Sequence, residues 1–250
     1  MSGPLDLDLP TSTVELTMWC ENLADADLLS MSDPACLVYI KDSKLKKDWF
    51  QVGMTEIIKD SLNPRWEKKF LMDYRFEERQ CLRFEVYDWD SESKELPDHD
   101  FLGWMECTFG EIVSKQNTGF TKFLEGTPGK PVAGRRGKIH VIAEELSENK
   151  EHVTFKFSAK KLDRKDWFGK SDPFLELHRS GGSNQYCLVH RTEVVKKTLD
   201  PDWKTFRISV RSLTNGDDGR DIKMEVYDWN RNGTHSMIGT FNTTLGQVNI

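Results

Sequence analysis

The sequence lacks several features that mark common classes of protein. No apolar run reaches the ~18 residues of a membrane-spanning helix. The first ten residues, MSGPLDLDLP, are acidic and lack the basic and apolar pattern of a secretory signal. Five cysteines occur, but no two have the C-x-x-C spacing of zinc and redox sites. These absences predict a cytosolic protein whose thiols are reduced.

An excess of positive charge is also absent. The chain carries 35 Lys and Arg against 41 Asp and Glu, a formal net charge of −6, which disfavours a general nucleic-acid binder. No G-x-S-x-G sequence, phosphate-binding loop or histidine–cysteine constellation occurs, so we predict that the chain is not an enzyme. The hydrophobic fraction of 37% over 250 residues suffices for one large or two ordinary domains.

The chain does contain a long repeat of itself. The stretch EVYDWD at 85–90 returns as EVYDWN at 225–230, and LNPRW at 62–66 returns as LDPDW at 199–203. SDP at 32–34 and TEIIKDS at 55–61 have counterparts in the same order. The copies lie roughly 137 residues apart, a domain-sized period that is far longer than a solenoid repeat. We therefore predict two domains, at residues 1–147 and 148–250.

Each copy has the hydrophobic pattern of strands. Apolar residues occupy every second position in 14–20 and 82–86, and again in 153–159 and 222–226. This period of two predicts half-buried strands. The strands are short and separated by Asp, Asn, Gly and Pro, which indicates an all-β fold of antiparallel sandwiches. We also expect one helical turn within 109–116 and a last strand of the first copy at 137–145.

Five aspartates of the first copy cluster around two predicted loops. Two flank the loop DLLSMSD, two follow the strand 82–87, and one precedes FLG; they are Asp27, Asp33, Asp88, Asp90 and Asp100. Carboxylates that converge at one end of a sandwich repel each other unless a cation lies between them. Calcium suits such a site because it takes six to eight oxygen ligands in irregular geometry. The alternative is that these are ordinary turn aspartates.

The ordered set of Asp27-x5-Asp33-Pro, LNPRW, YDWD and Asp100 before an apolar pair and Gly resembles the C2 domain, twice over essentially the whole chain. The resemblance implies an eight-stranded sandwich that binds calcium at one tip through these five aspartates. The strand order, with an extra strand at the end, resembles the permuted topology of that family. Two such domains at the start of a chain resemble the copines, although no von Willebrand factor A-like domain follows here.

The second copy keeps only part of this set. The matching residues are Asp166, Asp172, Asp228 and Asn230, and Ser236 stands where the first copy has Asp100. Formal ligand charge falls from −5 to −3, so we predict a markedly weaker calcium site. After Gly103, 43 residues run to Leu146, but only 11 follow Gly239. We therefore expect a C-terminally incomplete second sandwich with unpaired strand edges.

Apolar and basic residues accompany the acids. Apolar residues in the two acid-flanked loops could enter a bilayer interface or fold back on the core; they are Leu28, Leu29, Met31, Trp167 and Phe168. Lysines in two other loops could bind headgroups or form an ordinary solvated face; they are Lys44, Lys46, Lys47, Lys196 and Lys197.

The sequence and the resemblance together predict calcium-dependent binding to anionic, phosphatidylserine-like membranes, with protein partners in addition. The chain would be cytoplasmic and would move to plasma or internal membranes when calcium rises. The alternative is a calcium-independent protein-interaction scaffold, whose binding would survive chelation. A third candidate is the membrane-targeting fragment of an enzyme.

Overall fold

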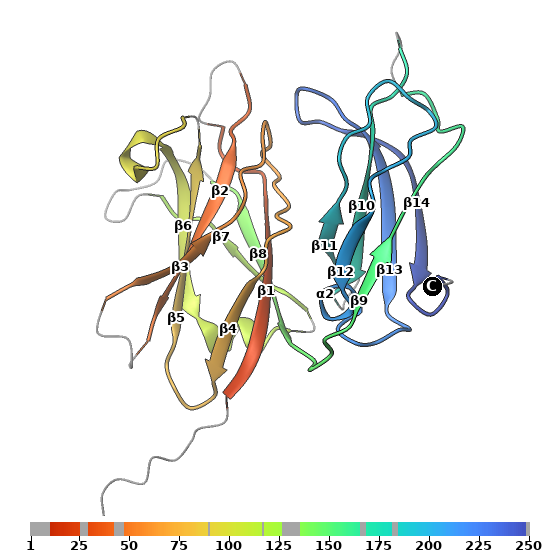
Figure 1. The fold of residues 1–250 in the computed structure, drawn as a ribbon. Coiled ribbons are helices and arrows are strands. Elements are labelled where there is room, and N and C mark those ends of the chain that lie inside the picture. The colour runs from red at the N-terminus through yellow and green to blue at the C-terminus, as the bar shows by residue number, and fades with distance from the viewer. Residues whose placement is uncertain are drawn as a thin grey trace, which may run out of the picture.

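The structure is a computed structural model that describes residues 11–25, 30–42, 48–89, 91–116, 118–126, 136–165, 169–181 and 185–248. Two antiparallel sandwiches lie side by side and are joined through residues 146–151 (Figure 1). The all-β prediction is confirmed. Within the described ranges, no helix is long and apolar enough to cross a membrane.

The first sandwich has eight strands in two four-stranded sheets. One sheet has the order β4 (Phe70–Arg75), β1 (Thr11–Glu21), β8 (Lys138–Glu145), β7 (Phe120–Phe123). The other has the order β3 (Phe50–Met54), β2 (Pro34–Lys41), β5 (Cys81–Asp88), β6 (Asp100–Thr108). The 3-10 turn η1 (Leu96–Asp98) precedes β6, and the expected helical turn, α1 (Phe109–Val113), follows it.

Alternation along the strands produces the core, as the period of two predicts. Val14, Leu16 and Met18 on β1 are all at most 2% exposed and pack in one cluster with the inward residues of the facing sheet. The tryptophan of LNPRW, Trp66, is fully buried, and its indole N–H donates to the Pro34 carbonyl (3.4 Å). Trp203 of LDPDW does the same to Pro173 (3.2 Å). Each tryptophan thus ties a loop to the strand that begins at the candidate site.

The second sandwich is smaller. One sheet has the order β11 (Tyr186–Arg191), β10 (Pro173–Ser180), β13 (Asp221–Asp228), β14 (Ser236–Thr244). Facing it is a pair of strands, β12 (Phe206–Ser209) and β9 (His152–Phe155), with the short helix α2 (Val210–Thr214). Among the described residues of this half, no strands stand where β8 and β7 stand in the first, so six strands are present rather than eight.

This difference exposes part of the second core. In the first sandwich the segment after β7 bridges to β6 at Glu125 and Trp104, and Met105, the next residue of β6, is fully buried in the core. Phe241 occupies the corresponding place on β14 and is 53% exposed. β9 pairs with β12, whereas its counterpart β1 pairs with both β4 and β8. The second sandwich therefore has an apolar surface that the first one covers.

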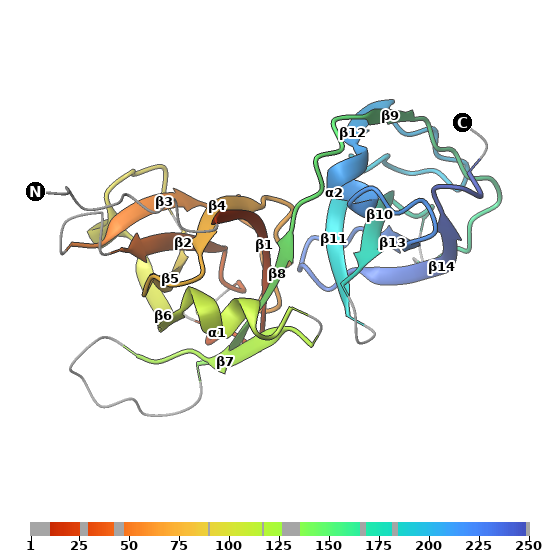
Figure 2. The same cartoon turned by 90° about the horizontal axis from the view of Figure 1, so that it is seen from below.

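The two sandwiches share a buried interface in which β1 and β8 face β11 (Figure 2). Arg179 is fully buried, and its guanidinium contacts the carboxylates of Glu15 (2.6 Å) and Glu144 (3.2 Å) of the first sandwich. A small apolar cluster and further polar contacts surround this network; they involve Trp19, Ile142, Cys187, Lys69, Leu188 and Arg220. A buried guanidinium with two carboxylate partners fixes the orientation of the two sandwiches, because separation would leave the charges unpaired.

All five cysteines lie in the described part of the chain, and none forms a disulfide. Burial raises the pKa of Cys107 to about 12 and raises that of Cys20 well above its ordinary value. Thiols with such pKa values remain protonated and unreactive near neutral pH. The four buried cysteines, Cys20, Cys36, Cys107 and Cys187, are thus packing residues.

Candidate metal sites

The topology brings three of the five predicted ligands of the first repeat to one end of a sheet. β2 begins at Pro34, which lies opposite Asp88 at the end of β5. Asp88 in turn lies opposite Asp100, the first residue of β6. Asp33 precedes β2 directly. These three acids therefore meet because β2 and β6 begin at the end of the sheet where β5 ends. Asp27 and Asp90 lie outside the described residues.

Asp88 is the centre of this site. Its side chain is fully buried, and its Oδ1 accepts a hydrogen bond from the backbone N–H of Asp33 (2.5 Å). Its Oδ2 is buried and has no hydrogen-bond partner among the described residues. A buried carboxylate oxygen without a donor is strongly unfavourable unless a cation satisfies it. The donor set fits calcium, a hard ion that binds carboxylate oxygens.

Asp33 is held in place by the loop 55–61. Its Oδ1 accepts from the backbone N–H of Asp60 (2.8 Å), and its Oδ2 forms an ion pair with the Lys59 ammonium. The left-handed backbone at Asp60 (φ 52°) turns that N–H toward the carboxylate. Asp33 is thus oriented before any cation binds.

The second repeat rebuilds the same frame. Asp228 is fully buried, its Oδ1 accepts from the Asp172 N–H (2.7 Å), and its Oδ2 lacks a partner in the described part of the chain. Asp172 accepts from the N–H of Lys197 (2.6 Å), which has the same left-handed backbone (φ 56°) as Asp60. Two sites with the same orphaned oxygen thus stand in the two halves; Asp166 lies outside the described residues.

The two halves also match a known family. Residues 14–123 and 153–250 each match the C2 domain family. The chain belongs to the C2 domain family. This match concerns the C2 domain alone, so membership of the copine type remains a proposal.

Solved structures with similar folds include tandem and single C2 domains. The paired C2 domains, A and B, of Extended-Synaptotagmin 2 are 17% identical, with 99% of this chain and 83% of that chain covered and a TM-score of 0.40. The first C2 domain of plant Extended Synaptotagmin 1 is 26% identical over 55% of this chain and 97% of that chain, with a TM-score of 0.40. BON1-C2B is 35% identical over 38% of this chain and 65% of that chain, with a TM-score of 0.35.

The second C2 site differs from the first in the residues that complete it. Asn230 stands in the position of Asp90, and its Nδ2 donates to the Thr234 carbonyl (2.8 Å) and to Ser236 Oγ (3.2 Å). Ser236 lies opposite Asp228, where the first C2 domain has Asp100. The loop is thus closed by internal hydrogen bonds between neutral groups at positions where the first C2 domain has carboxylates, so the second site has a lower ligand charge.

Of the predicted membrane-tip residues, Met31 is described and is half-buried. The other four, Leu28, Leu29, Trp167 and Phe168, lie outside the described residues. So do the lysines at 44, 46 and 47, whereas Lys196 and Lys197 are exposed. The Lys196 ammonium lies 5.0 Å from the centre of the Trp229 ring, a cation–π contact at the second C2 site.

One further cluster was not predicted from the sequence. Glu176, His178 and Glu225 lie on adjacent strands, and their potential ligand atoms are all within 4.8 Å of one another. Among the described residues, this is the one group of three or more His, Cys, Asp or Glu side chains that is close enough to hold a metal ion. His178 Nε2 lies 3.0 Å and 3.2 Å from the two carboxylates. Each carboxylate also contacts a cation: Arg191 pairs with Glu176, and Lys223 with Glu225.

This cluster is a buried ion network rather than a metal centre. Arg191 and Lys223 already balance the two negative charges, so a divalent cation would leave a large positive excess. Burial lowers the pKa of His178, but hydrogen bonds and charge from Glu176 and Glu225 outweigh burial and raise it overall. The sequence did contain a signal for this cluster. Glu176 and His178 stand at the strand positions where the first repeat has the uncharged residues Leu37 and Tyr39.

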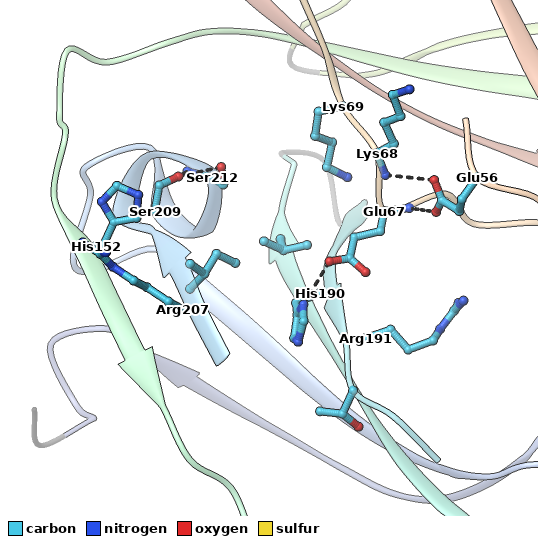
Figure 3. Close-up of a pocket in the computed structure, with 13 residues that line it drawn as sticks. Glu56, Glu67, Lys68, Lys69, His152, His190, Arg191, Arg207, Ser209 and Ser212 are labelled. Atoms are coloured by element: carbon cyan, nitrogen blue, oxygen red, sulfur yellow. Dashed lines mark hydrogen bonds and ion pairs between the residues drawn. The ribbon is translucent and has the colours of Figure 1, made fainter. Parts of the chain in front are cut away.

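A cavity of about 710 Å³ lies between the two C2 domains (Figure 3). Its charged groups are mostly engaged by each other and by backbone. The Glu67 carboxylate contacts His190 across the interface (2.9 Å), and Glu56 accepts from the backbone N–H groups of Glu67 and Lys68. Ser209 donates to Ser212 (2.7 Å). The cavity therefore belongs to the domain interface, where the contact of Glu67 with His190 joins the two domains.

Proposed function

We propose that this chain binds anionic phospholipid membranes in response to calcium, chiefly through the tip of its first C2 domain. The observation that carries the proposal is the buried, unpartnered Oδ2 of Asp88 beside Asp33 and opposite Asp100. Calcium there would bind Asp33, Asp88 and Asp100, with Asp27 and Asp90 supplied by the loops. Bound calcium would supply positive charge that cancels the repulsion between the acidic tip and anionic headgroups.

The second C2 domain would add a weaker contact. Its frame is intact at Asp172 and Asp228, but its charge is lower because of Asn230 and Ser236. Two linked weak contacts bind a surface more tightly than either one alone. In a cell the chain would be cytoplasmic at low calcium and would move to plasma or internal membranes when calcium rises, a behaviour that we propose together with membership of the copine type.

Sedimentation with vesicles tests this function. Vesicles of phosphatidylcholine with about a quarter phosphatidylserine would be titrated with calcium, with chelator as the zero point. We expect the wild-type chain to pellet as calcium rises, and the variant Asp88→Asn/Asp90→Asn to remain in the supernatant. Pelleting that is unchanged by chelator and by the double substitution would contradict the calcium switch.

A calcium-independent scaffold is the second candidate. The exposed apolar residues of β14, Met237 (45%) and Phe241 (53%), favour it because such a surface suits contact with another protein. Two observations distinguish the two functions. Binding to a protein partner would persist in chelator and would be weakened by Phe241→Ser. Calcium-dependent pelleting would be abolished by chelator and would be unchanged by Phe241→Ser.

A further inference from the structure

The two candidate calcium sites flank a common cleft of about 220 Å³. One wall is the segment 57–60 of the first C2 domain, which orients Asp33; the other includes Trp229, Asn230, Arg231 and Gly233 of the second. Gly233 has a left-handed backbone (φ 71°), and a Cβ there would lie 1.7 Å from the Asp60 carbonyl oxygen. The domains therefore meet backbone to backbone between the two sites, where a side chain larger than that of glycine cannot fit.

Lys59 belongs both to the cation site and to the cleft. Its ammonium pairs with Asp33 Oδ2, and its side chain lines the cleft while remaining 68% exposed. The same Asp33 carboxylate is a predicted calcium ligand. An ammonium and a calcium ion cannot both neutralise one carboxylate oxygen at full strength, so the two cations compete for Asp33.

The cleft has the chemistry of a phosphate site. Arg191 and Arg231 line it with Lys59 and His235, and Phe174 and Trp229 provide aromatic walls. Arg191 is positioned by its ion pair with Glu176 (2.6 Å), whereas Arg231 is exposed on the loop after Asp228. Several donors from arginine and lysine around a small opening are the usual means of binding a phosphate group. Among the described residues of the lining, the one carboxylate is Asp60.

We propose that Lys59 couples the cation site of the first C2 domain to a headgroup site between the two domains. Without calcium, the Lys59 ammonium occupies Asp33. When calcium takes Asp33, the ammonium is released into the cleft and binds, with Arg231, the phosphate of one lipid headgroup. This inference rests on the proposed function and adds a second, interdomain contact that becomes available when calcium binds.

The second C2 domain provides an internal comparison. Lys196 matches Lys59 in the repeat, but its ammonium lies over the Trp229 ring rather than on Asp172. No lysine side chain among the described residues pairs with Asp172, which is oriented by the backbone N–H of Lys197. The competition between lysine and calcium is therefore confined to the first site.

Calcium titration by calorimetry, without lipid, tests the competition. Lys59→Gln is compared with Lys115→Gln, which removes the same charge just after α1, at the other end of the first sandwich. We expect Lys59→Gln to raise the calcium affinity of the tighter site about two- to fivefold, as for loss of a partly exposed ion pair, and Lys115→Gln to leave it unchanged. Equal calcium affinities in the two variants would overturn the proposal. Because the titration contains no lipid, its result can be interpreted even if the chain binds no membrane.

Vesicle binding at saturating calcium tests the release. Here the same Lys59→Gln variant should bind phosphatidylserine vesicles about fivefold more weakly than Lys115→Gln, and Arg231→Gln should weaken binding without changing the tighter calcium site. Opposite effects of one substitution on calcium and on lipid are the expected signature. Undiminished vesicle binding by Lys59→Gln would overturn the inference while leaving the proposed function intact.

Soluble O-phosphoserine in place of vesicles identifies the source of the phosphate. We expect it to bind far more weakly than the vesicles, because it lacks the additional tip contacts of a membrane. O-phosphoserine that bound as tightly as the vesicles would overturn the assignment of the cleft to membrane lipid.

Discussion

The two C2 domains share a frame and differ in what surrounds it. In both, a buried aspartate at the end of a strand accepts from the backbone of a second aspartate, and that one accepts from a left-handed turn. These aspartates therefore accept hydrogen bonds that stabilise the loops of the fold, in addition to lying at the candidate site. Asn230 and Ser236 stand where the first copy has Asp90 and Asp100. Their side chains are joined to each other by a hydrogen bond, and no bond from either side chain to Asp172 or Asp228 occurs among the described residues. Folding therefore retains the frame in both domains, whereas ligand charge can vary independently.

The largest expected difference between the domains lies in their cores. Met105→Ala should lower the free energy of unfolding by about 2–5 kcal/mol, because it empties a fully buried site in the core of the first sandwich. Phe241→Ala, at the matching but half-exposed place, should cost less than about 1 kcal/mol. Urea unfolding followed by tryptophan fluorescence measures both. Equal losses would show that the second core is covered in solution.

The next comparison concerns the buried carboxylates. Asp88→Asn should reduce the affinity of the tighter calcium site by on the order of 100-fold, more than typical losses from outer contacts of a metal site. Asp228→Asn should leave that site unchanged, because Asp228 belongs to the weaker one. Calorimetric titration of both variants checks the assignment. A large loss of the tight site in Asp228→Asn alone would reverse the order of the two domains.

The second site can also be made to resemble the first. In an Asp88→Asn background, Asn230→Asp with Ser236→Asp restores the two missing charges and should raise calcium affinity at the second site by roughly tenfold. For the single change Asn230→Asp, the matched control is Asn232→Asp, since each adds one negative charge in the same loop and only Asn230 belongs to the site. An equal gain from the control would mean that net loop charge, rather than ligand identity, sets the affinity.

The smallest expected effect is on how the free energy of unfolding depends on pH. It comes from His178 of the second C2 domain, at the strand position where the first C2 domain has Tyr39. The folded-state pKa of His178 is raised despite burial, because Glu176 and Glu225 bond the protonated ring. Its stabilising contribution is therefore complete below the ordinary histidine pKa of about 6.5. It is lost as pH rises through the raised value. We expect His178→Gln to flatten the decline in unfolding free energy above neutral pH; an unchanged decline would exclude His178 as its source.

The acid limb of the same network has the opposite sign. Burial opposes ionisation of Glu225, but hydrogen bonds from His178 and Lys223 prevail and lower its pKa to about 2. Its contribution is present above the ordinary glutamate pKa and is lost as pH falls toward 2.

Much of the fold could be predicted from sequence because its signals are local. The period of two places β1 and β5, and the repeated EVYDW places the two sites at equivalent strand ends. The pairing of Asp88 with Asp33 and Asp100 follows from antiparallel neighbours, once the strands are known. These features depend on residues close together in the chain or on the duplication itself.

The contacts between domains could not be predicted in the same way. Arg179 matches Ile40 in the repeat, but its partners Glu15 and Glu144 come from the other half. The approach of Gly233 to Asp60 likewise depends on how loops of the two halves fold in space. The ion pair of Lys59 with Asp33 lies within the first C2 domain, but it too depends on the loop conformation. A single repeat contains no information about what its copy places against it.

The buried position of Arg179 has a consequence for dividing the chain into its two halves. A chain cut between β8 and β9 would leave a guanidinium without its countercharges in one fragment and two carboxylates without theirs in the other. The two halves are thus not equivalent at this interface. Each supplies the countercharge of the other, so the smallest unit that preserves this buried network is the pair.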